Sequence, residues 1–130
     1  MKFVFSAVLF TLATIVGHSA TAQQLVGSYI AVIGREDLYN SRGVRLRQPW
    51  QILRQDRANF HRFGIRHRGD TSDNFFANLN NRAIMERMVM NGYIDRRAAA
   101  TLVNGYSDAV LVRIYGRGGR GEYVEVTVYE

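Results

Sequence analysis

Residues 108–129 read DAVLVRIYGRGGRGEYVEVTVY, and this stretch decides the fold. Apolar and polar residues alternate on both sides of a glycine-rich centre, which is the pattern of strands that each bury one face. Two such runs around a turn predict an antiparallel β-hairpin. One face of this hairpin is expected to carry the aliphatic residues Val110, Val112, Ile114, Val124, Val126 and Val128.

The centre of the stretch, GRGGRG at residues 116–121, also fits the G-x-G-x-x-G spacing of a dinucleotide-binding loop. That loop needs a helix directly after it, so that the pyrophosphate meets a helix N-terminus. Here a strand follows, and we therefore expect no nucleotide and no other cofactor. We interpret the glycines as turn residues. Arg117 and Arg120 beside them are candidates for contact with an acidic partner.

Upstream of the hairpin, residues 28–33 (SYIAVI) predict a further strand. Three other segments have helical spacing of apolar residues and typical helix boundaries. These are 49–63, followed by Gly64; 82–91, capped by Asn81; and 96–104, between the cap residue Asp95 and Gly105. The order β-α-α-α-β-β predicts a small α+β domain, with about three antiparallel strands and the helices packed on one face.

The first 22 residues have the composition of a secretory signal peptide. Lys2 precedes an apolar run at residues 3–17, and residues 20–22 (ATA) fit the small-x-small pattern of a cleavage site. The run is shorter than the roughly 20 apolar residues of a membrane-spanning helix. We therefore expect cleavage after residue 22, no transmembrane segment afterwards, and a single exported domain, periplasmic or secreted, formed by residues 23–130.

The remaining composition is arginine-rich and free of cysteine, which excludes disulfides and thiolate metal sites. The chain has 17 basic residues and a formal net charge of +6, and Lys2 is its only lysine, so the other 16 are arginines. Codon bias of the host is one explanation. A functional explanation is affinity for planar anions, because guanidinium pairs bidentately with carboxylate and phosphate.

Asp56 breaks the apolar pattern of the first predicted helix. On a helical wheel it lies at the centre of the apolar face, among Ile52, Leu53, Phe60 and Phe63. A carboxylate in that position is costly unless it is paired, so we predict a partner, either an arginine or the backbone amides of a loop. We interpret Asp56 as a buried structural acid. The alternative is an acid with a shifted pKa at a reactive site.

The same helix carries a second stripe, formed by Trp50, Arg54, Arg57 and His61 at spacings of four, seven and eleven residues. Cations beside an indole can bind anions, so this stripe is the candidate anion-binding surface. A solvated helix face without a ligand is the alternative. His61 and His67 are six residues apart, with arginine between them and no carboxylate at helical offset, so no metal is expected.

These patterns predict a small exported, non-enzymatic binding domain. Its basic surface would meet an anionic partner of the cell envelope, such as an acidic protein, an envelope polymer or an anionic headgroup. The alternative is a secreted hydrolase, of a nuclease-like kind, that uses Asp56 and His61. These two side chains lie about 140° apart on a helical wheel, which disfavours a shared catalytic cleft.

Overall fold

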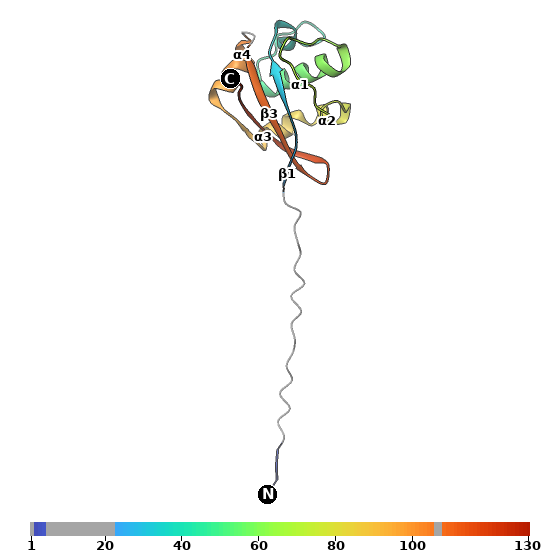
Figure 1. The fold of residues 1–130 in the computed structure, drawn as a ribbon, viewed down its shortest axis with the longest axis vertical. Coiled ribbons are helices and arrows are strands. Elements are labelled where there is room, and N and C mark those ends of the chain that lie inside the picture. The colour runs from blue at the N-terminus through green and yellow to red at the C-terminus, as the bar shows by residue number, and fades with distance from the viewer. Residues whose placement is uncertain (1, 5–22, 106–107) are drawn as a thin grey trace.

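The computed structural model describes residues 2–4, 23–105 and 108–130 (Figure 1). Most of the predicted signal peptide, residues 1–22, therefore lies outside the described residues. Every described strand and helix lies between Gln24 and Val128. Residues 23–130 thus contain the whole described fold. Within the described ranges, none of the helices combines the length and apolar character that crossing a bilayer requires.

The predicted β-hairpin is present. Strand β3 (Ala109–Arg117) pairs antiparallel with β4 (Arg120–Val128). The two residues between them, Gly118 and Gly119, have φ angles of 55° and 78°. A two-residue hairpin turn with positive φ at both positions matches the right-handed twist of the strands, and glycine adopts it at no steric cost. The GRGGRG motif therefore forms a tight turn between two strands.

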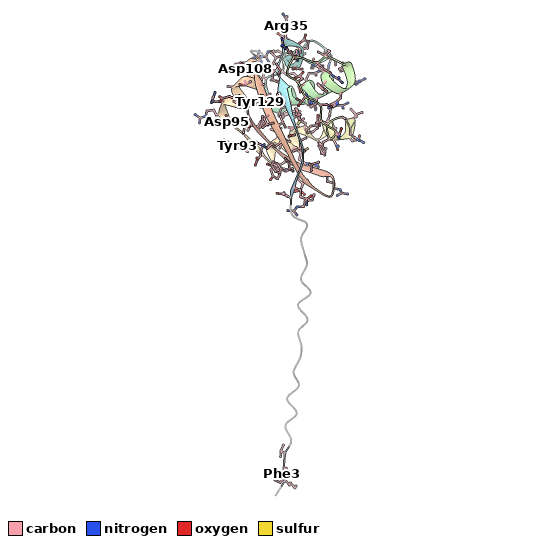
Figure 2. The ribbon with its side chains drawn as sticks, in the orientation of Figure 1. Phe3, Arg35, Tyr93, Asp95, Asp108 and Tyr129 are labelled. Carbon is pink, nitrogen blue, oxygen red and sulfur yellow. The ribbon has the colours of Figure 1, made fainter. Side chains whose placement is uncertain are left out.

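The sheet has one more strand than the sequence predicts. Strand β1 (Gln24–Val32) pairs antiparallel with β3, and the sheet order is β1-β3-β4-β2. The additional strand β2 (Tyr93–Ile94) is parallel to β4, which makes the sheet mixed rather than purely antiparallel. Figure 2 labels Tyr93 beside Asp95, the cap of the next helix. Two residues are too short to produce an alternating pattern, so the sequence carries no signal for β2.

The first predicted helix is present with a change of winding near its end. It comprises α1 (Pro49–Ala58) and a π-helical turn, η2 (Asn59–Phe63), which ends at Gly64 with a φ of 69°. A short 3₁₀ helix, η1 (Arg35–Leu38), lies in a segment whose composition predicts only a loop.

The second predicted helix is divided. It forms α2 (Leu79–Ala83) and α3 (Met85–Met90), which meet at Ile84. The cap is Asn78 rather than Asn81, and its side chain accepts hydrogen bonds from two backbone amides of the first turn. The third helix, α4 (Arg96–Asn104), has the predicted bounds, with Asp95 as its cap and Gly105 at its end.

The hydrophobic core confirms the α+β class. In the central parts of the three long strands, alternate residues are fully buried and those between them only partly: Tyr29 and Ala31 of β1, Val110, Val112 and Ile114 of β3, and Val124 and Val126 of β4. The core therefore lies on one face of the sheet, where α3 and α4 contact β4. The largest buried apolar side chains are Tyr29, Ile33, Ile52, Leu53, Phe76, Met85, Met88, Leu102 and Ile114.

Gly92 is the residue that lets β2 approach β4. A Cβ atom at this position would lie 1.9 Å from the carbonyl oxygen of Val124. We expect Gly92→Ala to lower the free energy of unfolding by about 2–3 kcal/mol, because backbone atoms must move to remove the overlap. Urea unfolding followed by circular dichroism measures this change.

Gly27→Ala is the matched control, because a Cβ there meets only the Ile114 side chain at an ordinary 3.9 Å. Equal stability of the two variants would contradict the proposed close approach of β2 to β4.

Candidate functional site

Arg57 lies at the centre of a buried ionic cluster. Its Nε donates to Asp56 Oδ2 at 2.8 Å, and its Nη1 donates to Asp73 Oδ1 at 2.9 Å. The same Nη1 donates to the carbonyl oxygen of Thr71 at 3.1 Å. Neither the guanidinium nor the two carboxylates has appreciable contact with solvent. This cluster joins α1 to the loop at residues 71–73.

The placement of Arg57 corrects the prediction of an exposed basic stripe. Arg57 has an exposed fraction of 0% and cannot bind a partner at the surface. Helix α1 buries two adjacent columns of side chains, one through Ile52 and Asp56 and one through Leu53 and Arg57. The buried face of α1 is therefore wide enough to include the charged residues Asp56 and Arg57 as well as the apolar ones.

Asp56 is buried, as the helical wheel places it, and it pairs with an arginine. Burial raises the pKa of Asp56 to about 8, against the lowering effect of the adjacent Arg57 charge. Burial works to lower the pKa of Arg57, but the charge of Asp56 raises it above its ordinary value.

Aromatic rings enclose the same guanidinium. Its central carbon lies 3.9 Å from the ring centroid of Tyr29 and 4.6 Å from that of Phe60. The guanidinium of Arg66 lies 4.2 Å from the Phe60 centroid. A planar cation stacks on aromatic faces in a way that an ammonium group does not, which is one structural reason for arginine at these positions.

His61 also faces this cluster rather than a surface stripe. Its Nε2 lies 2.9 Å from Asp73 Oδ1, the oxygen that Arg57 also contacts. The other oxygen of Asp73 accepts a hydrogen bond from the Phe76 amide at 2.6 Å. Asp73, which the sequence analysis does not single out, is therefore the carboxylate that joins His61 and Arg57. The arrangement fixes the loop at residues 71–73 against α1 and η2.

A second group of acids holds other loops in place. Asp37 accepts hydrogen bonds from the Asn59 side chain at 2.9 Å and from the Gly34 amide at 3.0 Å. Asp70 accepts from the amides of Val32 and His67, each at 2.7 Å. In the described ranges, no set of three or more His, Asp or Glu side chains is placed to bind a metal ion.

These loop contacts also shift pKa values. Burial raises the pKa of Asp37, although hydrogen bonds from Asn59 and Gly34 oppose the shift. Burial works to lower the pKa of His67, but its hydrogen bond to Glu36 and the charges of Asp37 and Asp70 raise the pKa overall. Both groups therefore retain protons in the folded state at a higher pH than in the unfolded chain.

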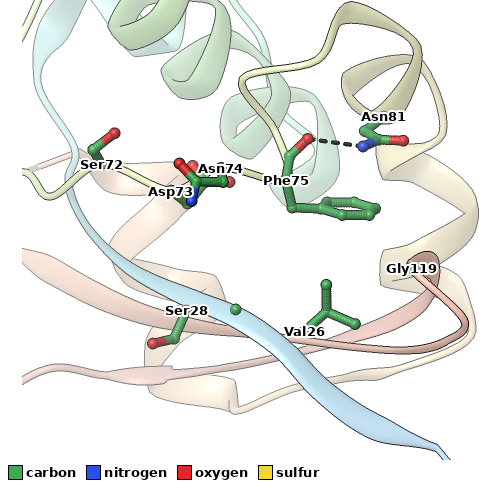
Figure 3. A pocket seen from close by; sticks show the side chains of 9 residues that line it. Val26, Ser28, Ser72, Asp73, Asn74, Phe75, Asn81 and Gly119 are labelled. Atoms are coloured by element: carbon green, nitrogen blue, oxygen red, sulfur yellow. Dashed lines mark hydrogen bonds between the residues drawn. The ribbon is translucent and has the colours of Figure 1, made fainter.

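A pocket of about 490 Å³ lies between β1 and the loop at residues 72–75. Figure 3 shows Phe75 above Val26, with Asn81 donating to the Phe75 carbonyl oxygen. Among the described residues of its lining, Asp73 alone is ionisable, and both of its carboxylate oxygens are hydrogen-bonded.

A second hollow, of about 270 Å³, is lined by the three arginines Arg54, Arg62 and Arg82. Of the residues that the structure describes, those lining this hollow include no Asp or Glu. Within the described part of the chain, none of these three guanidinium groups lies within salt-bridge distance of a carboxylate. Gln55, Ala58, Leu79 and Ala83 complete the lining.

Each of these arginines is held by a local contact. The Arg54 guanidinium lies 4.9 Å from the Trp50 ring centroid, and the Arg62 guanidinium lies 5.0 Å from the Phe63 centroid. Arg82 is buried, and its Nη1 donates to the carbonyl oxygens of Phe76 and Ala77. Arg54 and Arg62 therefore line the hollow as exposed cations from α1 and η2, whereas Arg82 of α2 lines it as a buried one.

Of the predicted anion-binding residues, only Arg54 lines this hollow, and its guanidinium lies over the Trp50 ring. Arg117 and Arg120 are exposed beside the β3–β4 turn, where Arg117 Nε lies 3.5 Å from Glu122 Oε1. Neither of these two lines the hollow. Arg82 belongs to a helix whose sequence pattern indicates only an apolar stripe, so nothing in the sequence links it to Arg54.

Comparison with known proteins finds no matching family model, no matching curated protein and no matching solved structure.

The forked geometry of Arg57 predicts a large effect of a conservative substitution. A lysine keeps the charge but cannot direct separate donors to Asp56, Asp73 and Thr71. We expect Arg57→Lys to lower the free energy of unfolding by about 3 kcal/mol, because buried acceptors lose their donors. Urea unfolding at neutral pH measures the change. Arg54→Lys is the matched control. An equal decrease in the free energy of unfolding for this variant would disprove the special role of Arg57.

The buried acids predict that stability falls as pH rises. Asp56 holds its proton up to about pH 8 in the folded state, whereas an unfolded chain releases it near pH 4. The free energy of unfolding should therefore fall by roughly 1 kcal/mol per pH unit between pH 5 and pH 8. The raised pKa values of Asp37 and His67 act in the same direction.

Urea unfolding at several pH values tests this dependence. Asp56→Asn imitates the protonated acid and should flatten the slope, whereas Asp95→Asn, at the cap of α4, should leave it unchanged. A free energy of unfolding that is constant or increases over this pH range would rule out a buried acid that holds its proton.

Proposed function

We propose that this protein is a small exported, non-enzymatic binding domain whose arginine-lined hollow holds an anionic partner. The observation that carries the proposal is that the exposed Arg54 and Arg62 line one hollow together with the buried Arg82, and that none of the described residues lining it is acidic. Like charges gathered without counter-charges repel one another, and an anion between them relieves that repulsion. The export of the protein is inferred from the composition of residues 1–22.

The chemistry of the hollow favours oxyanions. Guanidinium groups present planar pairs of donors that match carboxylate and phosphate oxygens. Stacking on Trp50 and Phe63 holds the Arg54 and Arg62 side chains, which reduces the entropy lost when an anion binds. An acidic protein, an envelope polymer or an anionic headgroup can supply such an oxyanion.

The buried acids support a binding role over the hydrolytic alternative. A general base must reach the proton that it removes from a substrate or a water molecule. Asp56 has an exposed fraction of 1% and is paired with Arg57. The His61 ring is directed to Asp73. These side chains make their contacts inside the domain, whereas the side chains exposed for anion binding are those of the arginines.

Binding to a soluble polyanion tests the proposal. We expect residues 23–130 to bind polyphosphate in isothermal titration calorimetry, and added salt should weaken the binding. The double variant Arg54→Ala/Arg62→Ala should bind roughly tenfold more weakly, because charge-assisted hydrogen bonds are lost.

The matched control is Arg87→Ala/Arg96→Ala, which removes the same charge from two exposed arginines outside the hollow. Equal losses in both double variants would show that net charge alone attracts the polyanion, and the hollow would then not be the binding site.

A further inference from the structure

Two large apolar side chains, Phe63 and Leu79, are exposed to solvent at or beside residues that line the arginine-lined hollow. Leu79 lines the hollow and has an exposed fraction of 65%. Phe63 has an exposed fraction of 52%, and the Arg62 guanidinium that lines the hollow lies over its ring. Apolar and cationic groups therefore alternate on one small surface, which we call the α1–α2 face and define by Arg54, Arg62, Phe63, Leu79 and Arg82.

We propose that the α1–α2 face docks on an anionic lipid bilayer. The phosphate groups of the lipid headgroups bind the exposed Arg54 and Arg62 in the hollow, and Phe63 and Leu79 enter the boundary between the headgroups and the acyl chains. This inference rests on the anion-binding function proposed above, and it names the partner of that same site.

Charge complementarity supports the electrostatic part of the docking. The face offers the exposed guanidinium groups of Arg54 and Arg62, and none of the described residues in the lining is a carboxylate. The surface of a bilayer that contains anionic lipids attracts basic side chains. Each phosphate offers oxygens that a guanidinium contacts in pairs. The small size of the hollow suits a single headgroup that protrudes from a surface.

The two exposed apolar side chains distinguish a bilayer from a hydrated polymer. A polyphosphate or an acidic polysaccharide binds through charge and leaves Phe63 and Leu79 in water. A bilayer also accepts apolar side chains below its headgroups, as it does for amphipathic segments that lie in the interface. Stable attachment needs two such contributions together, and the α1–α2 face supplies both.

Trp50 adds an aromatic group of the kind that favours membrane interfaces. Its ring is partly buried and lies under the Arg54 guanidinium. Indole combines an apolar body with one polar N–H group, and tryptophan is accordingly enriched at the level of lipid headgroups. Arginine side chains also keep their charge in water while their methylene stems lie along apolar surface. The chemistry of the whole face is consistent with a lipid interface.

Vesicle cosedimentation tests the proposal with residues 23–130, because the apolar run at residues 3–17 would itself bind lipid. One set of vesicles contains phosphatidylcholine alone, and the other also contains phosphatidylglycerol. We expect the protein to bind the anionic vesicles. Its partition into the neutral vesicles should be roughly tenfold weaker, because their surface carries no net charge.

The decisive variant removes the apolar contacts and keeps the charges. We expect the partition coefficient of Phe63→Ser/Leu79→Ser into anionic vesicles to fall roughly tenfold, because the apolar contribution to binding is lost. Its affinity for polyphosphate should equal that of the unmodified protein. Val44→Ser/Met90→Ser is the matched control, since both side chains are exposed and lie outside the α1–α2 face. It should bind both partners normally. Circular dichroism confirms that each variant is folded.

The outcomes separate the two proposals. Polyphosphate binding without vesicle binding would overturn the bilayer inference and leave the anion-binding function standing. Vesicle binding that survives Phe63→Ser/Leu79→Ser would also overturn it, because charge alone would then account for the attachment. Failure to bind either polyphosphate or anionic vesicles would overturn both proposals.

Discussion

The ionic contact of Arg57 with Asp56 and Asp73 holds the helical layer, the loop at residues 71–73 and the sheet in one arrangement. Asp56 belongs to the same helix as Arg57, Asp73 belongs to the loop, and Tyr29 of β1 lies against the guanidinium. A charge without contact with water must be paired and hydrogen-bonded, because its desolvation is otherwise too costly. The loop consequently has little freedom to leave its position while the core remains closed.

That loop in turn covers part of an open sheet edge. Thr71 accepts from the Ile30 amide through its hydroxyl and donates its own amide to the Ile30 carbonyl oxygen. Asp70 accepts from the Val32 amide. These contacts satisfy backbone groups on the side of β1 that has no neighbouring strand, and they protect the edge against pairing with another chain. The polar residues of this segment therefore hydrogen-bond both to the backbone of β1 and to Arg57 in the ionic cluster.

One helix thus presents arginines to two different environments. Arg57 faces inward and balances buried acids, whereas Arg54, three residues earlier, is exposed and lines the hollow. The inward contact fixes the rotation of α1, and this rotation sets the direction of Arg54. Arg82 is fixed by carbonyl oxygens of the segment that precedes α2. The proposed binding face is consequently built on a rigid interior, as precise binding sites require.

The sequence by itself determined the α+β class, the β3–β4 hairpin, the bounds of α4 and the burial of Asp56. All of these follow from local rules, because alternation, capping and helical spacing depend on residues close together in the chain. Tertiary structure alone decided the parallel pairing of β2 with β4, the inward placement of Arg57 and His61, and the meeting of Arg54 with Arg82. Each of these depends on contacts between residues that are distant in sequence, such as His61 with Asp73 or Gly92 with Val124. Such pairings depend on how the layers pack, and no local pattern records them.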